Sequence, residues 1–390
     1  MAIKISKNMC NPMKFIKYIT AVLLLLNTAI LAEQNNQLVQ HDLIQERTII
    51  AREYFNIGSS FLRLKKYQEA IEYFNIAIKY SPGYAPAYNG KGIALDGFGK
   101  PLEAIENYDL AIKYNPHFAE AYNNKAVSYR EHGKNEEAII LCNLAIKYKP
   151  HFAEAYNNKG ASLARLGQYE EAMENYDIAI KYEPNNPEAY YNKGIALLHL
   201  GDIHGAIENY DIAIRYRPNY SEAYHNKGLT LAIWGQFQNA IEHFDLAIKY
   251  DPNDLKAYNN KGYVLNLLKR PAEAMESCNL AIKIDPNCAD SYYIKGMVFE
   301  KLGKHQEAIK NYDIAIKYNP NFDKNYLEKG ISLVNLGQYS SAKENFLLAI
   351  KYNPNIISEH ETMLKRLTEL KNFTGVKEYE QKLQILKKYS

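Results

Sequence analysis

The sequence predicts an all-α fold, in which pairs of helices are stacked into a long array. The first observation is a period: nine prolines follow one another at intervals of 34 residues, namely Pro82, Pro116, Pro150, Pro184, Pro218, Pro252, Pro286, Pro320 and Pro354. The second is that each interval holds two helical patterns of apolar residues with a short turn between them. A period of this length is typical of repeat proteins, whose units bury their apolar faces only against their neighbours.

Residues 1–32 precede the array and have the layout of a secretory signal peptide. Lys14 and Lys17 come before an apolar run that extends from Ile19 to Ala32 and ends in a small residue. The run is short for a membrane span. We therefore expect cleavage after Ala32 and export to the periplasm or the medium. An uncleaved membrane anchor and a cytoplasmic protein are the alternatives, and membrane contact is expected only through this segment before cleavage.

Residues 33–50 are predicted to be a spacer and an N-terminal helix extension. Residues 33–41 are polar, which favours a flexible linker. Asp42 and Gln45 then have the spacing of a capping box, and the apolar residues Leu43, Ile44 and Ile49 follow. The first helix of the first repeat is therefore expected to extend backwards into this segment.

Residues 51–356 form nine repeats of 34 residues, and the fourth, residues 153–186, shows their common frame. Gly167 is expected to end its first helix, and Pro184 its second, because proline cannot continue the hydrogen-bond ladder. At 100° per residue the apolar residues of each helix fall on one face. These residues are Tyr156, Gly160, Leu163, Ala172, Tyr176 and Ala179.

This frame resembles the tetratricopeptide repeat over residues 51–356. The sixth unit matches the family's aromatic, small, glycine, alanine and proline positions with Tyr224, Gly228, Gly235, Phe237, Ala240, Phe244, Ala247 and Pro252. The resemblance implies an α-solenoid of antiparallel helix pairs, wound into a right-handed superhelix with a concave groove. Two units depart from the frame, since Lys65 and Lys269 replace the loop glycine. Those two turns need another way to end the helix.

Residues 357–390 are predicted to be a degenerate tenth repeat that caps the array. The segment has the length of one repeat and two runs of apolar residues, but it lacks the alanine pair and the proline. Its lysines and glutamates provide the polar outer surface that a terminal unit needs.

The composition and motifs exclude several classes of function. The net charge is +3, and four lysines lie in the first 32 residues, which contain no acid, so the remainder carries 3 − 4 = −1. This balance does not favour nucleic acid as a partner. We find no catalytic motif, phosphate-binding loop or metal-ligand spacing, so we expect no enzyme activity, cofactor or metal. Cys142 and Cys278 occupy an aromatic position of the frame, and we expect them to be buried thiols.

Charged residues recur at two places of the repeat. A lysine stands at repeat position 7 in eight units, near the core face, and we expect its stem to pack between units while its ammonium group lies in water. On the second helix, pairs such as Asp109 and Lys113 or Asp245 and Lys249 have the i, i+4 spacing of a helical ion pair.

The candidate binding residues lie on the first helices, on the face that we expect to be concave. Positions 5 and 6 of successive units carry mostly amides: Asn56, Asn123, Asn124, Asn157, Asn158, Tyr191, Asn192, His225, Asn226, Asn259 and Asn260. Position 9 is mostly apolar: Ile93, Val127, Ile195, Leu229, Met297 and Ile331. A row of amides can bond to the backbone of an extended peptide, and an exposed apolar strip suggests a partner. We expect alanine substitution of the position 6 amides to weaken binding without lowering stability.

The leading hypothesis for function is a non-enzymatic scaffold that binds an extended peptide or helix of another protein in its groove after export. A secreted, effector-like adaptor that acts on host proteins is the first alternative. An accessory that binds an enzyme's substrate or a glycan is the second. Near-identical segments such as residues 117–125 and 151–159 also leave open that duplication alone spread the asparagine row.

Overall fold

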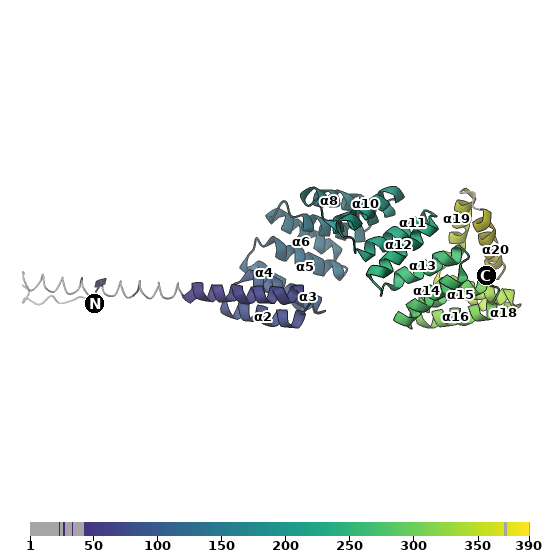
Figure 1. Ribbon diagram of the computed structural model, residues 1–390, viewed down its shortest axis with the longest axis horizontal. Helices are drawn as coiled ribbons and strands as arrows, with labels where there is room; N and C mark the ends of the chain where they lie inside the picture. Colours follow the sequence, from purple (N-terminus) through teal and green to yellow (C-terminus); the bar gives the residue numbers. More distant parts are fainter. Residues whose placement is uncertain (1–22, 24–25, 28–32, 34–42, 370–372, 390) are drawn as a thin grey trace, which may run out of the picture. The chain divides into compact units, whose positions relative to one another are not determined.

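The computed structural model describes residues 23, 26–27, 33, 43–369 and 373–389 (Figure 1). Most of the expected signal peptide and spacer, including the expected cleavage site, lies outside the described residues. Among the helices that are described, none combines the length and the apolar character that crossing a membrane requires.

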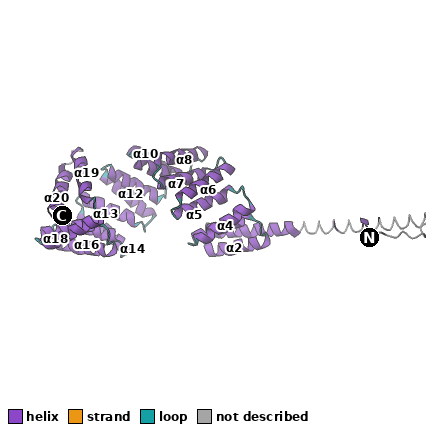
Figure 2. Cartoon of the chain, turned by 180° about the vertical axis from the view of Figure 1, so that it is seen from behind, coloured by secondary structure: helices purple, strands orange, loops and turns teal. Residues whose placement is uncertain are grey.

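The described chain folds as antiparallel helix pairs, which confirms the predicted all-α solenoid (Figures 1 and 2). It divides into two compact units, Met1–Gln168 and Tyr169–Ser390, which are treated separately. In the first unit a helix over residues 43–63 is followed by α2 (Tyr67–Tyr80), α3 (Ala85–Gly97), α4 (Pro101–Tyr114), α5 (Ala119–Glu131), α6 (Asn135–Tyr148) and α7 (Ala153–Arg165).

The second unit continues the same alternation. Its helices are α8 (Tyr169–Tyr182), α9 (Pro187–His199), α10 (Ile203–Tyr216), α11 (Ser221–Ile233), α12 (Phe237–Tyr250), α13 (Leu255–Leu267), α14 (Pro271–Ile284), α15 (Ala289–Lys301), α16 (His305–Tyr318), α17 (Asp323–Asn335), α18 (Tyr339–Tyr352), α19 (Ile356–Glu369) and α20 (Phe373–Tyr389). Within each unit, every odd-numbered helix through α17 packs on its even-numbered neighbours.

The turn inside each repeat ends the first helix with one residue in the left-handed conformation. In the second repeat this residue is Gly99, with φ of 80°, and the next residue, Lys100, donates its backbone N–H to the carbonyl oxygen of Leu95. This is the usual glycine C-cap, which satisfies carbonyl groups that the helix leaves open. Lys65 and Lys269 end their helices in the same way, because each adopts the left-handed conformation itself, with φ of 57° and 58°.

The core of most repeats contains an aromatic ring from the second helix that lies against a glycine of the first. At Gly296 an added Cβ would lie 2.4 Å from Cε1 of Tyr312, so the ring occupies the space of the missing side chain. In the third repeat the second helix carries Cys142 instead, and the matching position on the first helix is Ala126. Both residues are buried. Because the side chain of Cys142 is smaller than an aromatic ring, there is room for the methyl group of Ala126.

Five of the eight position 7 lysines are paired with an aspartate of the preceding repeat, which corrects the expected helical pairs. The ammonium group of Lys125 lies 2.6 Å from Asp109 Oδ1, a residue of the preceding repeat. The same pairing recurs for Lys193 with Asp177, Lys227 with Asp211, Lys261 with Asp245 and Lys329 with Asp313. The stems do pack between repeats, but these ammonium groups contact a carboxylate of the neighbouring repeat.

The last helices close one end of the second unit. Leu386 of α20 is buried in a cluster that contains Phe346 of α18 and Ile356, the first residue of α19. Lys382 of α20 also reaches Glu328 of α17. The C-terminal helix therefore contacts the first helix of the ninth repeat.

Candidate functional site

The candidate site is the surface formed by the first helices of successive repeats. In the first unit these are α3, α5 and α7, and in the second α9, α11, α13, α15 and α17, and each contacts the next of its own unit. At 100° per residue, positions 2, 6, 9 and 13 of such a helix share one face, whereas positions 5 and 12 are turned to one side of it. We call the shared face the inner face.

The predicted amides bond to one another across repeats. The side chain at position 6 donates from its Nδ2 to the side chain at position 5 of the preceding repeat, 35 residues earlier. We call these bonds the amide ladder. It comprises Asn124 to Asn89 (3.0 Å), Asn158 to Asn123 (2.9 Å), Asn226 to the Tyr191 hydroxyl (2.8 Å) and Asn260 to His225 Nε2 (3.2 Å).

Charged groups at the ends of the ladder bonds determine their direction. Asn123 donates its own Nδ2 to the Glu154 carboxylate at 3.1 Å, which leaves its Oδ1 as the acceptor for Asn158. Arg130 donates to Oδ1 of Asn158 at 3.0 Å, which leaves Nδ2 of Asn158 as the donor. A carboxylate can only accept and a guanidinium can only donate, so both amide orientations follow from chemistry.

In the second unit a histidine replaces the amide at one position 5. Nδ1 of His225 lies 2.9 Å from Asp254 Oδ2, and its Nε2 accepts from Asn260. Burial alone would raise the pKa of Asp254, but hydrogen bonds from His225 and the backbone of Ala257 hold that pKa below its usual range. Burial raises the pKa of Tyr191 to about 12, so its hydroxyl stays protonated. In this unit the ladder therefore consists of Asn226 with the Tyr191 hydroxyl and Asn260 with His225, and His225 in turn contacts the Asp254 carboxylate.

The position 5 side chains do not lie on an exposed groove wall, which corrects the sequence-based placement. Asn123, Asn157, His225 and Asn259 are buried, and Tyr191 is half-buried. These side chains are buried because position 5 is rotated away from the inner face, toward the next repeat, which covers it. At position 6, Asn158 is also buried. Asn124, Asn192, Asn226 and Asn260 are half-buried there, whereas Asn56 of the first repeat is exposed.

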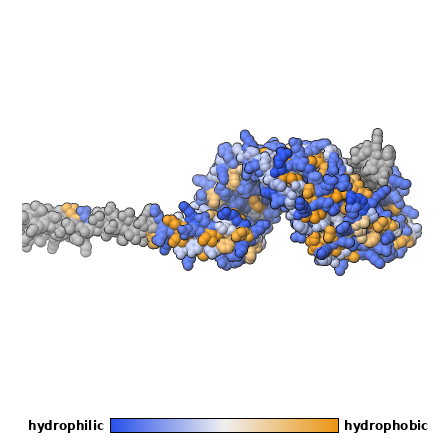
Figure 3. All heavy atoms as spheres, viewed as in Figure 1, coloured by the Kyte–Doolittle hydropathy of each residue, from blue (hydrophilic) through white to orange (hydrophobic). Residues whose placement is uncertain are grey.

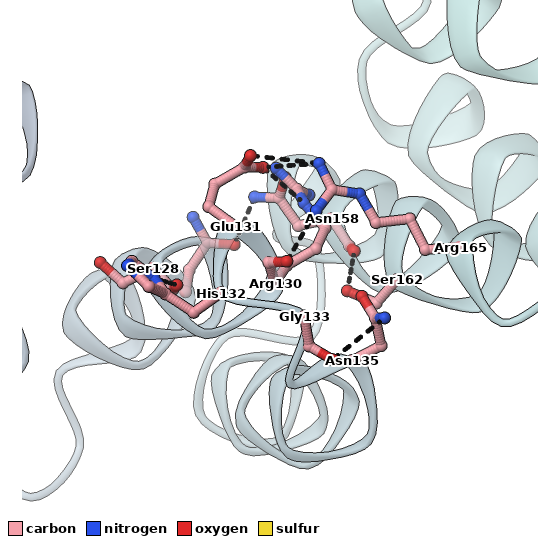
Figure 4. Close-up of polar contacts among 10 residues, drawn as sticks. Ser128, Arg130, Glu131, His132, Gly133, Asn135, Asn158, Ser162 and Arg165 are labelled. Atoms are coloured by element: carbon pink, nitrogen blue, oxygen red, sulfur yellow. Dashed lines mark hydrogen bonds and ion pairs between the residues drawn. The ribbon is translucent and has the colours of Figure 1, made fainter. Parts of the chain in front are cut away.

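The inner face of the first unit carries a charged network beside the ladder (Figure 4). Arg165 of α7 donates to both carboxylate oxygens of Glu131 at 3.1 Å and to the backbone carbonyl of Arg130 on α5. Burial would raise the pKa of Glu131, but the hydrogen bonds from Arg165 and Arg130 hold it below its usual range. The network therefore joins α5 to α7 and makes this part of the inner face polar.

The inner face of the second unit is apolar over three neighbouring helices. Ile195 and Leu229 at position 9 are half-buried, and Tyr263 at the same position is 41% exposed. One turn further, at position 13, Ile233 is 56% and Leu267 36% exposed. We call these five residues the inner strip. Figure 3 shows that apolar residues gather on the visible face of the second unit.

The remaining predicted apolar residues lie outside the inner strip, two in the first unit and two in the second. Ile93, Val127 and Met297 are half-buried, and Ile331 is buried. The sequence prediction missed three residues of the strip: Tyr263 at position 9, and Ile233 and Leu267 at position 13, which are the most exposed aliphatic residues of the strip. The spacing of Ile233 and Leu267, four residues after position 9, was the signal that could have identified these two.

The structure offers no metal centre within the residues that it describes, because no three His, Cys, Asp or Glu side chains are grouped there as ligands. Cys142 and Cys278 are fully buried, as expected, and burial raises the pKa of each thiol to about 12. Both cysteines therefore stay protonated and belong to the core.

Comparison with protein families places repeat models along most of the chain. Models described as tetratricopeptide repeat match residues 51–84, 89–153, 187–220, 221–254, 255–288, 289–322 and 323–356. A model described as TPR repeat matches residues 162–201. No curated protein sequence matches the chain.

Several solved structures are similar to this chain. The APC/C hetero-tetramer Cut9–Hcn1 contains a chain with a TM-score of 0.54 and 15% identity, with 74% of this chain and 56% of that chain covered. YrrB, described as a TPR protein with an unusual peptide-binding site, has 25% identity and a TM-score of 0.39, with 49% of this chain and 98% of that chain covered. MamA has 26% identity and a TM-score of 0.38, over 44% of this chain and 94% of that chain.

Proposed function

The chain belongs to the tetratricopeptide repeat family, and from this we propose that it is a non-enzymatic scaffold that binds a peptide segment of another protein on its inner face. Repeats of this family support protein–protein interaction as the general role. The proposal adds the place of binding and the chemistry of contact.

The observation that carries the proposal is the inner strip of the second unit. Ile233, Tyr263 and Leu267 expose 56%, 41% and 36% of their surface on adjacent helices. Apolar side chains that are exposed singly need no explanation, but a contiguous apolar surface between polar residues is typical of an interaction site. A peptide that covers this strip would remove the apolar surface from water.

The amide ladder contributes a second type of contact. Because Asn226 and Asn260 use their Nδ2 groups within the ladder, the oxygen of each amide is the group that remains to accept from a ligand. The backbone N–H groups of an extended peptide are suitable donors. We therefore propose that apolar side chains of the partner contact the inner strip while its backbone donates to these amide oxygens.

Selection of peptides on the purified protein, followed by affinity measurements, tests the proposal. A library of random peptides would be selected against the mature chain, and the Kd of the best peptide measured by fluorescence anisotropy. Replacement of Ile233 and Leu267 by Lys should weaken binding by about tenfold or more, since each substitution places a charge in the apolar contact. The matched control is Leu280→Lys on α14, because Leu280 is 42% exposed on a second helix.

The result that contradicts the proposal is equally specific. If the inner-strip double variant binds the selected peptide as tightly as the unaltered protein, the inner strip is not the binding surface. If Leu280→Lys weakens binding as much as the double variant does, the contact lies on the second helices.

We also propose that the protein acts after export, in the periplasm or outside the cell. The support is the layout of residues 1–32, with two lysines before a short apolar run. The N-terminal mass of the protein from its native cells tests cleavage, and an intact Met1 or Met13 would contradict it. Cell fractionation then separates an envelope scaffold, which stays with the cell, from a secreted adaptor, which is found in the medium or in a host cell.

A further inference from the structure

The second unit contains a pocket that the peptide-binding proposal does not use. Its volume is about 250 Å³, and its walls come from α15, α17 and α20 together with His305 at the start of α16. Met297, Ile331 and Ile385 provide apolar wall, and Glu300 and Glu328 provide carboxylates. Met297 and Ile331 are position 9 residues, so the pocket lies at the end of the inner face beyond the inner strip.

Both carboxylates are held in place by neutral or basic donors. Oε2 of Glu300 accepts from the Tyr312 hydroxyl at 2.8 Å. Glu328 is only 5% exposed and accepts from the ammonium group of Lys382 at 2.7 Å. Burial raises the pKa of Tyr312 well above its usual value, and the charges of Glu300 and Glu328 add to this rise. Both carboxylates lie in the wall of the same pocket.

Lys382 shows that a basic side chain can bind at this site. It is contributed by α20, 54 residues away from Glu328 in the chain, and its ion pair is one of the least exposed, at 15% and 7% of the two side chains. The other lysine of the pocket wall, Lys301, reaches away from α17, toward the carbonyl oxygen of Asn266 on α13. The side of the pocket between α15 and α17 is thus rich in acceptors.

His305 adds a further acceptor. Its Nδ1 is buried and has no hydrogen-bond partner among the described residues. An imidazole nitrogen that carries no proton can accept a hydrogen bond. A buried polar atom without a hydrogen-bond partner is unfavourable, so a ligand that donates to this nitrogen would be stabilised by the new bond.

We propose that this pocket binds the guanidinium group of an arginine side chain from the peptide on the inner face. A guanidinium has five N–H donors in a plane and pairs well with carboxylates, which suits walls that contain Glu300, Glu328 and His305. The apolar walls can pack against the methylene groups of the arginine side chain. A volume of about 250 Å³ suits one side chain better than a larger ligand. The placement of the arginine within a peptide rests on the proposed function, whereas the pocket itself does not.

The first experiment tests the pocket without a peptide. Nα-acetyl-L-arginine N-methylamide is titrated into the full chain with ¹³C-labelled methionine and isoleucine methyl groups, and NMR shifts are followed at Met297, Ile331 and Ile385. The matched control ligand is the citrulline analogue, which has the same shape and no charge. We expect saturable shifts of these methyl groups with the arginine ligand and binding weaker by about tenfold or more with the citrulline ligand.

Two variants define the contact further. Glu300→Gln keeps the shape and an acceptor for Tyr312, and it should weaken arginine binding by about tenfold. Its control is Glu307→Gln, since Glu307 is exposed on α16 and is not part of the pocket wall. Lys382→Met should strengthen arginine binding by several fold, because it removes the cation that competes for Glu328. This variant tests the site even if Glu300→Gln does not fold.

The outcomes separate this proposal from the peptide-binding proposal. Equal binding of the arginine and citrulline ligands, or shifts only at methyl groups outside the pocket, would overturn it. So would an unchanged affinity in Lys382→Met. A second arm compares a selected peptide that contains arginine with its citrulline version. If the peptide binds equally well in both forms, peptide binding stands and the arginine pocket is refuted. If the arginine amide binds in the pocket and no peptide binds, the site accepts a free cation and the inner-face proposal is wrong.

Discussion

Asn158 donates a hydrogen bond to Asn123 at 2.9 Å, and the two residues lie 35 apart in the chain, on the first helices of successive repeats. The bond is buried, and each amide is completed by a charged group, Glu154 for Asn123 and Arg130 for Asn158. An amide that looks like a free ligand contact in the sequence is thus part of the contact between repeats. Stacked repeats depend on such contacts for their cooperativity.

Asn158→Ala should lower the free energy of unfolding, contrary to the expectation from the sequence. The substitution leaves Oδ1 of Asn123 and one N–H of Arg130 without their partner. We expect a loss of about 1–3 kcal/mol, measured by urea denaturation, because buried polar groups would lose their hydrogen bonds. The control is Asn56→Ala, at the same repeat position but exposed, which should change the free energy by less than about 0.5 kcal/mol. Equal effects of the two substitutions would rule out a structural role for the ladder.

The period of the sequence was sufficient to predict the helix pairs but not the partners of the amides. Proline and glycine positions act locally, because they end helices whatever surrounds them, so the 34-residue interval between Pro150 and Pro184 predicts one repeat. Whether Asn123 faces solvent or Asn158 depends on how the next repeat packs. The helical period within one repeat carries no information about that packing. The same limit explains why Asp109 pairs with Lys125 rather than with Lys113.

The pocket could not be predicted for a related reason. Glu328 occupies repeat position 6, where most units carry asparagine, and this departure is visible in the sequence. Its partner Lys382 belongs to the segment that lacks the repeat frame, so no period relates the two residues. Only the folded chain brings them together.

Gly296→Ala should destabilise the protein, whereas Gly262→Ala should be tolerated. At Gly296 the new Cβ would lie 2.4 Å from the buried ring of Tyr312, but at Gly262 the nearest atom is Cys278 Sγ at 3.1 Å. Overpacking of a core costs about 1–3 kcal/mol, while alanine gains about 1 kcal/mol over glycine inside a helix. Thermal unfolding of the two variants should therefore give a much lower midpoint for Gly296→Ala.

A double variant tests the cause of that difference. Gly296→Ala combined with Tyr312→Cys recreates the pair found naturally as Ala126 and Cys142 in the third repeat. The second substitution should cost less in the Gly296→Ala background than alone, because alanine fills part of the space that the ring leaves. Strict additivity of the two free-energy changes would mean that the glycine and the ring do not act as a packing pair.

Asn279→Asp should stabilise the second unit in a salt-dependent manner. Asn279 accepts from Lys295 at 3.0 Å in the place where neighbouring repeats have an aspartate, such as Asp245 with Lys261. The substitution would convert the contact into an ion pair that is partly exposed, for which we expect a gain of about 0.2–1 kcal/mol at low ionic strength. The gain should largely vanish at about 1 M salt, where the screening length falls to about 3 Å. Asp245→Asn is the reverse control, and a gain that is independent of salt would contradict the ion-pair explanation.

Lys269→Gly should stabilise the protein because it relieves the backbone at the turn of the seventh repeat. Lys269 has φ of 58°, in the left-handed region, whereas the corresponding residue of the next repeat is Gly303, with φ of 71°. A side chain in this conformation costs about 1–2 kcal/mol, and the greater freedom of glycine in the unfolded chain offsets part of the gain. We expect a net increase of about 0.5–1 kcal/mol in the free energy of unfolding, measured by urea denaturation. Gly303→Ala is the matched reverse substitution: an added Cβ there meets nothing within 4 Å, so a loss of stability would come from the backbone alone. If Lys269→Gly lowers stability instead, the lysine side chain stabilises the turn by more than the strain that its backbone conformation introduces.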